Sequence, residues 1–308
     1  VKARFDEANN ILMARRLEKA GAHVIYGLVG LKTHSKCTLV IRREKDGIRR
    51  YVHVATGNYN ASTAKLYTDL GILTCSDRFG IDASAFFNLL SGYSDPPIWD
   101  SFIVAPINLR QRCIELIDRE IHFAKNGEDA HMIAKMNSLL DKGIIEKLYE
   151  ASQAGVKIEL IVRGICVLIP GIPGVSDNIT VRSIVGRFLE HSRIFWFRNG
   201  GREELYVSSA DWMPRNLNDR VELMVPIEDP EIKRRLKQMV DIELSDNQKA
   251  HIMQADGTWL KTISAENQLC AQEYFQKIAE KRDAEDEMTL AQKLEPYTPV
   301  LGHGDGSD

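Results

Sequence analysis

A repeated unit is the feature that most constrains the fold of this 308-residue chain. Each copy begins with a histidine, has a basic residue two positions later, and continues as a strand, a tight turn and a second strand. The first copy starts at His34 and turns at Asp46–Gly47, whereas the second starts at His191 and turns at Asn199–Gly201. Glycine turns between apolar runs indicate β-hairpins. The returning strands end in small polar residues, Thr56–Asn58 and Ser208–Asp211. An imidazole, a cation and a polar loop at one end of a hairpin indicate a phosphate pocket.

A helix and a strand precede each copy. Residues 6–20 and 141–154 have helical periodicity, and each segment is followed by a glycine that favours the end of a helix. We expect the strands that follow at 22–26 and 156–162. Residues 164–190 are a longer insertion in the second copy. The common order of helix, strand and histidine hairpin predicts an internal duplication that forms two similar α/β units.

Composition limits the classes of protein more than it identifies one. The net charge of -3 gives no general attraction to nucleic acid or to an anionic membrane, so a polyanion site must be local. The five cysteines have no paired spacing, which favours a reducing compartment and no zinc site. No apolar run approaches the roughly 18 to 20 residues that span a bilayer. We expect a cytoplasmic protein, with a peripheral membrane location left open. Because Val1 is no natural start, we expect a C-terminal fragment.

The turn-rich segment 94–97 divides the chain into two expected domains. The first covers 1–97 and the second 98–295, with a disordered tail at 296–308 that is rich in Gly and Asp. The other expected elements are helices at 83–90, 108–126, 230–242 and 266–286, and strands at 102–106 and 131–138.

The histidine units resemble the two half-sites of the phospholipase D superfamily. That superfamily usually has an aspartate five residues after the basic residue, whereas Ile41 and Arg198 stand there in this chain. One branch, the polyphosphate kinase family, fits better, because its motifs occur in order from Arg4 to about Asp246. They include residues 3–7, 30–36, 55–60, 66–69, 162–164 and 208–213. The resemblance implies two phospholipase D-like α/β domains packed as a pseudo-twofold duplication, without the domains that precede them in the family.

The resemblance also implies a reaction. In this family a histidine takes the terminal phosphoryl group of ATP and passes it reversibly to polyphosphate, and His34 matches that histidine. Neutral imidazole is a suitable nucleophile near pH 7. His191 matches the second essential histidine, which is placed to exchange a proton with a phosphate oxygen and to contact ATP. We expect Asp69 to orient His34 by accepting a hydrogen bond from the other ring nitrogen.

Cations surround the expected phosphate path. Arg4, Lys36, Arg163 and Arg220 match basic residues that line the family's phosphate tunnel, and guanidinium groups can bind two phosphate oxygens at once. Tyr67 and Arg163 match positions that contact the nucleotide, and Asn58 joins the candidates for phosphate binding from its polar loop. The resemblance implies Mg²⁺ near Arg4. Since arginine cannot ligate a metal, we expect Arg4 to hold the phosphates that carry the ion.

Three functional classes remain open. The first is the ATP:polyphosphate phosphotransferase, with ATP, ADP and polyphosphate as ligands and a homo-oligomer at full length. The second is a phosphodiesterase or nuclease of the phospholipase D type. The third is a fragment that binds polyanions without catalysis. Structural roles compete at single residues: Lys135 and Asn137, at the end of a strand, are left open, and Arg220 could pair with Asp219 or Glu222 instead of phosphate.

Overall fold

The computed structural model describes residues 7–92 and 98–293, with side chains as far as residue 282. Arg4, the boundary segment 94–97 and the expected tail 296–308 lie outside the described residues. Across the described part of the chain, no helix is both long and apolar enough to cross a membrane.

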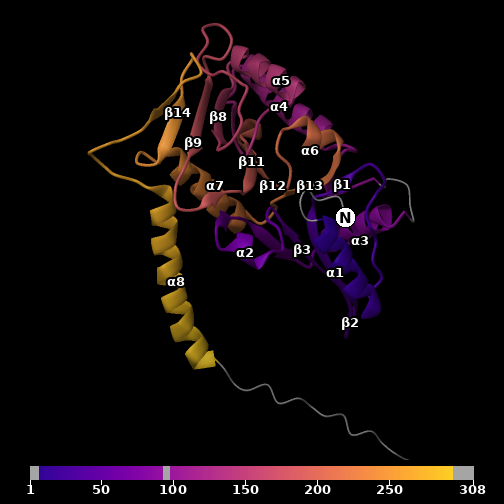
Figure 1. The fold of residues 1–308 in the computed structure, drawn as a ribbon. Helices are drawn as coiled ribbons and strands as arrows, with labels where there is room; N and C mark the ends of the chain where they lie inside the picture. The colour runs from indigo at the N-terminus through magenta and orange to yellow at the C-terminus, as the bar shows by residue number, and fades with distance from the viewer. Residues whose placement is uncertain (1–6, 93–97, 294–308) are drawn as a thin grey trace, which may run out of the picture.

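A ten-stranded mixed sheet forms the centre of the molecule (Figure 1). The strands run in the order β1-β13-β12-β11-β7-β8-β9-β14-β15, and β6 pairs with β13. Their bounds are β1 Lys32–Thr33, β6 Ile103–Ala105, β7 His131–Met136, β8 Lys157–Val162, β9 Ile179–Ile184, β11 Arg193–Phe197, β12 Glu204–Ser208, β13 Arg220–Pro226, β14 Ala250–Met253 and β15 Trp259–Lys261. Apart from β1, every strand of this sheet comes from residues 98 onward, which we call the second half of the chain.

Helices cover both faces of this sheet, so its central strands bury side chains on both sides, most of them apolar. Successive side chains of β11 point to opposite faces. Phe195 and Phe197 pack in the core beneath α4 and α5, whereas Ile194 and Trp196 pack in the core beneath α7. These helices are α4 Leu109–Lys125, α5 Lys142–Gln153 and α7 Pro230–Leu244.

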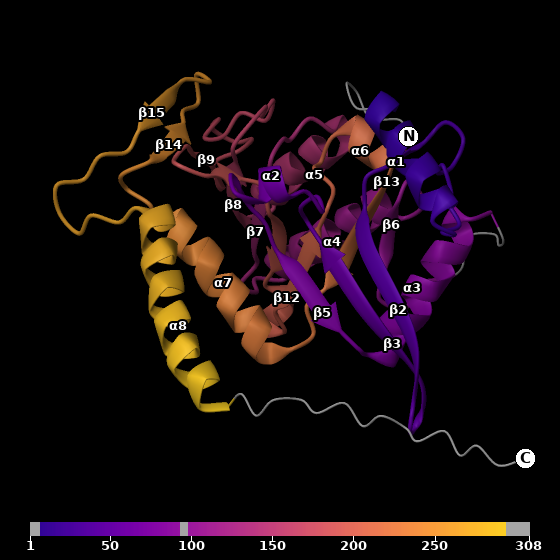
Figure 2. The same cartoon turned by 60° about the horizontal axis from the view of Figure 1, so that its bottom comes forward.

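The first half of the chain forms a three-stranded antiparallel sheet with α3 against it (Figure 2). Its core joins the second half, because Val52 and Phe86 share one buried cluster with Phe102 and Val221. The bounds are α1 Glu7–Lys19, β2 Lys36–Glu44, β3 Gly47–Ala55, α2 Ala61–Ala64, β4 Tyr67–Thr68, β5 Gly71–Thr74 and α3 Asp77–Leu90.

Two short parallel pairs connect the halves. Strand β1, just before His34, pairs with β13, so that Thr33 lies opposite Val221. Strand β10 (Leu189–Glu190), just before His191, pairs with β4, so that Glu190 lies opposite Thr68. Each histidine is therefore preceded by a strand that pairs with the other half.

Two further helices are α6 Pro214–Asn218 and α8 Ala271–Lys293.

The mixed α/β class is confirmed, and both histidine hairpins form, as β2–β3 and β11–β12. The strand expected at 22–26 is wrong: this segment is irregular and Tyr26 is exposed, since none of the described strands pairs with it. The strand expected at 131–138 ends at Met136, and the helix expected from 266 begins at Ala271. The insertion 164–190 contains β9 and β10, which we did not expect; β9 pairs with the neighbouring β8 and with β14, whereas β10 pairs with β4 of the other half.

Candidate phosphate-handling site

The two strand pairs that connect the halves, β1 with β13 and β10 with β4, bring each histidine next to a carboxylate of the other half. One residue beyond the pair Thr33–Val221 stand His34 and Glu222. The Nδ1 atom of His34 lies 2.8 Å from one carboxylate oxygen of Glu222 and 2.9 Å from the other. Glu222 is fully buried, whereas the side chain of His34 is 17% exposed. The bond fixes the ring through Nδ1, so Nε2 is the ring nitrogen that this contact does not engage.

The second half-site repeats this arrangement. One residue beyond the pair Glu190–Thr68 stand His191 and Asp69, with 2.7 Å between Nδ1 and Oδ1. Asp69 therefore orients His191, and the expectation that it orients His34 is wrong. The reason is topological, because β4 runs beside β10 rather than beside β1. Reasoning from sequence placed Asp69 with the nearer histidine in the chain.

Hydroxyl groups from the polar loops hold the two carboxylates. Thr56 Oγ1 donates to Asp69 across 2.6 Å, and Ser209 Oγ donates to Glu222 across 2.5 Å. Each hydroxyl also accepts a backbone N–H bond of 3.0 Å, from Leu70 and Leu223 respectively. These loop residues thus have matching contacts in both halves, and they orient the carboxylates that orient the histidines.

Gly57 permits the close approach of Asp69 to its loop. A Cβ atom at this position would lie 2.1 Å from Asp69 Oδ2, which is far inside van der Waals contact. The position that follows Ser209 in the second half is Ala210, which is fully buried. The loop at Thr56–Asn58 therefore needs a glycine to make room for the Asp69 carboxylate, whereas the loop at Ser208–Asp211 accommodates an alanine at the matching position.

Burial sets the protonation of both imidazoles. It is the largest cause that lowers the pKa of His34 below 6.5, and the bond to Glu222 opposes it. Burial also lowers the pKa of His191, against the bond to Asp69, and the charges of Arg193 and Lys36 lower it further. Neutral rings are therefore favoured near pH 7, as a nucleophile and a general base require.

Two cations follow the histidines in the sequence and lie inside the site. Lys36 Nζ donates to the backbone carbonyl of His34. Arg193 donates to the carbonyl of His191 at 2.7 Å and pairs with Asp211 at 3.1 Å. Burial lowers the pKa of Lys36 to about 8, although Glu222 raises it. Arg193 also donates to the backbone carbonyl of Thr56 at 3.5 Å, so the second half-site contacts the polar loop of the first half.

Tyr67 and Arg163 lie on the His191 side. The Tyr67 ring centre is 5.0 Å from that of His191. Arg163 Nε donates to Asn137 Oδ1 at 2.6 Å and to the backbone carbonyl of Glu190 at 2.5 Å. The contact gives Asn137, left open by the sequence, a role in holding Arg163. Tyr67 and Arg163 line a cavity of about 490 Å³ together with residues 184–190.

Arg220 lies on the His34 side. Its guanidinium is 3.9 Å from Glu222, and its side chain is 18% exposed, so a phosphate can still reach it. Asn58 is exposed at the tip of its loop. Where the structure describes the chain, no cluster of three acidic, histidine or cysteine side chains could hold a metal ion.

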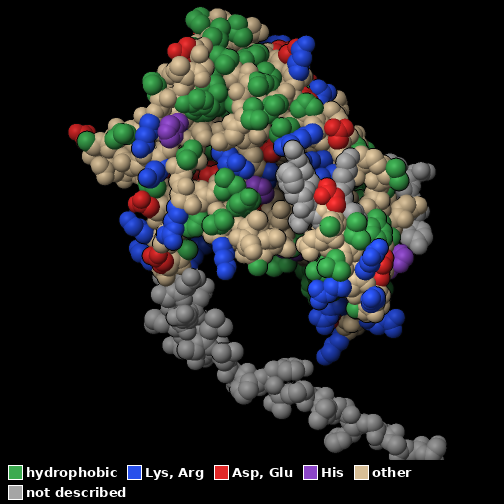
Figure 3. All heavy atoms as spheres, viewed as in Figure 1, with side chains coloured by type: hydrophobic (Ala, Val, Ile, Leu, Met, Phe, Trp, Pro, Cys, Tyr) green, Lys and Arg blue, Asp and Glu red, His purple; other side chains and the backbone are tan. Residues whose placement is uncertain are grey.

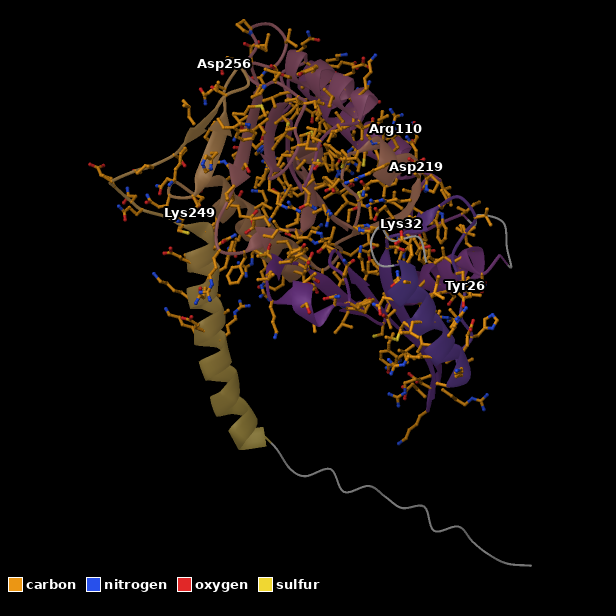
Figure 4. The ribbon with its side chains drawn as sticks, in the orientation of Figure 1. Tyr26, Lys32, Arg110, Asp219, Lys249 and Asp256 are labelled. Carbon is orange, nitrogen blue, oxygen red and sulfur yellow. The ribbon has the colours of Figure 1, made fainter. Side chains whose placement is uncertain are left out.

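On the face drawn in Figure 3, lysine and arginine side chains lie near a histidine. Figure 4 shows Lys32 and Asp219 on neighbouring segments, where the Lys32 amide donates to the Asp219 carbonyl at 3.1 Å. This bond continues the pairing of β1 with β13 at the edge of the site.

Sequence reasoning predicted both histidines but missed Glu222 as the partner of His34. The duplication contained the signal, because Asp69 and Glu222 each follow the hairpin of their own half and precede an apolar residue, Leu70 or Leu223. Superposing the two copies in sequence would have shown the match. It could not have shown that the carboxylates are exchanged between halves.

Comparisons with known proteins agree with this architecture. Residues 1–96 match the family described as polyphosphate kinase C-terminal domain 1, and residues 102–272 match polyphosphate kinase C-terminal domain 2. A polyphosphate kinase of Halalkalibacterium halodurans is 60% identical over 250 residues, which are 81% of this chain and 36% of the relative. One of Synechocystis sp. is 55% identical over 284 residues, covering 91% of this chain and 39% of the relative.

A solved structure has the same fold. The crystal structure of polyphosphate kinase from Porphyromonas gingivalis is similar with a TM-score of 0.85 and 36% identity, over 92% of this chain and 44% of that one. The chain thus spans about two fifths of the length of these relatives. Since the two matched C-terminal domains together cover most of the chain, it belongs to the polyphosphate kinase family.

Proposed function

We propose that this chain carries out the phosphoryl transfer of polyphosphate kinase, the reversible transfer of the terminal phosphate of ATP to polyphosphate through a phosphohistidine. The observation that carries the proposal is the Nδ1 contact of His34 with buried Glu222, which leaves Nε2 as a neutral, oriented nucleophile. The high identity to polyphosphate kinases supports it.

The first step forms one bond and breaks one. His34 Nε2 attacks the γ-phosphorus of ATP, and the bond from that phosphorus to the oxygen bridging to the β-phosphate breaks, so that ADP leaves with the electron pair. Positive charge builds on the ring, and the Nδ1–H bond to Glu222 stabilises it. In the second step a terminal oxygen of polyphosphate attacks the same phosphorus, and the P–N bond breaks.

The surrounding groups supply charge and protons. Lys36, Arg163 and Arg220 neutralise the non-bridging phosphate oxygens, which is the main requirement of phosphoryl transfer. His191 is neutral and is oriented by Asp69, so it can accept a proton from an attacking phosphate oxygen or return one to a leaving oxygen. Tyr67 and Arg163 bind the nucleotide in the cavity beside His191.

Magnesium enters this proposal as part of the nucleotide substrate. The carboxylates beside the histidines, Glu222 and Asp69, are engaged by the imidazole rings and by hydroxyl groups. No described group of three possible ligands could hold a metal ion, and the nearby cations suit phosphate oxygens. Arg4 completes the proposed phosphate site, Asn58 borders it, and the proposed domains remain 1–97 and 98–295. We further propose a cytoplasmic homo-oligomer for the complete enzyme.

Labelling with γ-³²P ATP tests the proposal. Label that stays on the protein, is lost in acid and survives alkali supports a phosphohistidine. Cleavage of a phosphodiester without labelled protein would instead assign the chain to phosphodiesterases. If neither occurs while polyphosphate still binds, the chain is a polyanion-binding unit without catalysis.

A further inference from the structure

Glu190 is the centre of a buried polar network that the proposed reaction does not use. Its carboxylate accepts bonds from Lys135 Nζ at 2.7 Å, Thr68 Oγ1 at 2.9 Å and Gln272 Nε2 at 2.7 Å. Lys135 also contacts Glu243, and all three charged side chains are at most 5% exposed. A buried charge with this many partners is held in one geometry, because loss of any partner leaves it unsatisfied.

The network touches the second half-site at three points. Glu190 is the residue immediately before His191, and its backbone carbonyl accepts the bond from Arg163 Nε. Thr68 lies between Tyr67 and Asp69, so the Thr68–Glu190 bond joins the two strands one residue from the His191–Asp69 pair. The position of one carboxylate therefore affects the nucleotide-side arginine, the tyrosine and the histidine together.

Among the residues that the structure describes, the first half-site has no matching network. In the matching pair of strands, the residues that stand in the places of Glu190 and Thr68 are Thr33 and Val221. Thr33 is exposed, and valine offers no hydroxyl. The duplication keeps the histidines and their carboxylates in both halves, but the buried network occurs only where Tyr67 and Arg163 lie.

Helix α8 supplies one arm of the network. Asp246 accepts a bond of 2.7 Å from the Ala271 amide and thereby fixes the start of the helix. Gln272, the next residue, bonds Glu190 and also both backbone polar groups of Phe188, at 3.0 and 2.9 Å. A Cβ atom at Gly186 would lie 2.3 Å from Gln272 Oε1, so the two segments are in close contact. Gln272 thus clamps residues 186–190, which line the cavity beside Tyr67.

We infer that Gln272 and Glu190 are positioning residues for the nucleotide side of the site, and that α8 holds this side in its binding geometry through the Gln272–Glu190 bond. The inference rests on the proposed function, since it assigns the Tyr67–Arg163 cavity to the nucleotide. The His34 side, where the phosphoryl group is accepted, does not depend on this bond.

Three variants separate this role from simple packing. Gln272→Ala removes the amide, Gln272→Glu keeps its shape but places a carboxylate against Glu190, and Thr68→Val removes only the hydroxyl. We expect ATP to bind about threefold more weakly in Thr68→Val and roughly tenfold more weakly in Gln272→Ala, with a larger loss in Gln272→Glu. At saturating ATP, the rate of protein labelling should fall by a smaller factor than the ATP affinity does, because the nucleophile His34 lies outside this network. Thr33→Val, the matched position in the other half, should not change ATP affinity.

Hydrogen exchange gives a readout that needs no nucleotide. Gln272→Ala should speed amide exchange at 186–191 and leave 32–36 unchanged. A lower melting temperature with wild-type ATP affinity and wild-type exchange at 186–191 would overturn the inference and reduce Gln272 to an anchor for α8. If wild type neither binds ATP nor becomes labelled, the proposed function fails, and the exchange result still decides whether Gln272 holds this segment.

Discussion

His34 and Glu222 lie 188 positions apart in the chain, yet the imidazole Nδ1 is 2.9 Å from a carboxylate oxygen of Glu222. Glu222 is held in turn by Ser209 and by Asn216, whose amide donates to it at 2.7 Å. The ring that we propose as the nucleophile is therefore oriented by the second half of the protein.

Replacing His34 and replacing His191 should impair different steps of the proposed reaction. His34→Ala removes the nucleophile, so we expect no phosphorylated protein at any time. His191→Ala removes an acid–base group, so turnover should fall by roughly 10² to 10⁴ while slow labelling remains. Rapid-quench labelling with γ-³²P ATP measures both. Complete loss of label in both variants would contradict the division of roles.

Replacing the carboxylates should separate the two half-sites. Glu222→Gln keeps the shape of the side chain but removes the charge that stabilises the His34 ring, and we expect labelling to slow by about 100-fold or more. Asp69→Asn acts on His191, so it should slow polymer formation more than labelling. Equal effects of both changes on the labelling step would show that the carboxylates do not serve separate histidines.

The rate of labelling should have a bell-shaped dependence on pH. The pKa of His34 is lowered by burial, so the neutral ring is already the main form at pH 6.5, and the rate should fall only at lower pH. The high-pH limb should reflect Lys36, whose pKa burial lowers to about 8, because loss of its charge leaves phosphate oxygens uncompensated. Lys36→Arg should keep activity and move this limb to higher pH. A limb that stays near pH 8 in Lys36→Arg would assign it to another group.

Thermal melts across the same range serve as the control for unfolding. A histidine whose pKa is lower in the folded state than in the unfolded state binds protons preferentially when unfolded. Folding stability from His34 and His191 is therefore complete above pH 6.5 and declines as pH falls below that value. If labelling slows at a higher pH than the pH at which the protein begins to unfold, the low-pH limb reflects catalysis and not unfolding.

Arg220 should contribute to polyphosphate binding through its charge. Contacts with a polyanion release condensed counterions, so affinity should fall steeply with salt, and Arg220→Gln should flatten that slope. The side chain is 18% exposed and only 3.9 Å from Glu222, so a structural role competes. Polyphosphate affinity against salt, with melts of the same proteins, separates them: an unchanged slope with a lowered melting temperature would make Arg220 a structural partner of Glu222.

Gly57→Ala should damage the second half-site through sterics alone. The new methyl group would overlap Asp69 Oδ2 at 2.1 Å, so we expect the carboxylate to move and turnover to fall by at least about tenfold. Asp69→Gly removes all three side-chain atoms that would clash, Oδ2, Cγ and Cβ. In a double-mutant cycle, Gly57→Ala should therefore add little to Asp69→Gly, and additive losses would locate the damage elsewhere.

Local patterns predicted both hairpins and helix α5, because each depends on residues close together in sequence. The irregular segment at 22–26 shows the limit of such patterns, since an apolar run becomes a strand only where a neighbour offers backbone partners. The contact of Glu222 with His34 and the buried polar network around Glu190 could not be predicted, because both depend on which strands pair across the halves. Asp69 was recognised as an orienting carboxylate and given to the wrong histidine for the same reason.

The exchange of carboxylates also limits how such a protein can be inherited. A recombination event that replaced one half with that of a distant relative would combine a histidine from one lineage with a carboxylate from the other at both half-sites. Each half carries the imidazole of its own half-site and the carboxylate that contacts the imidazole of the other. Descent should therefore preserve the two halves as a single heritable unit.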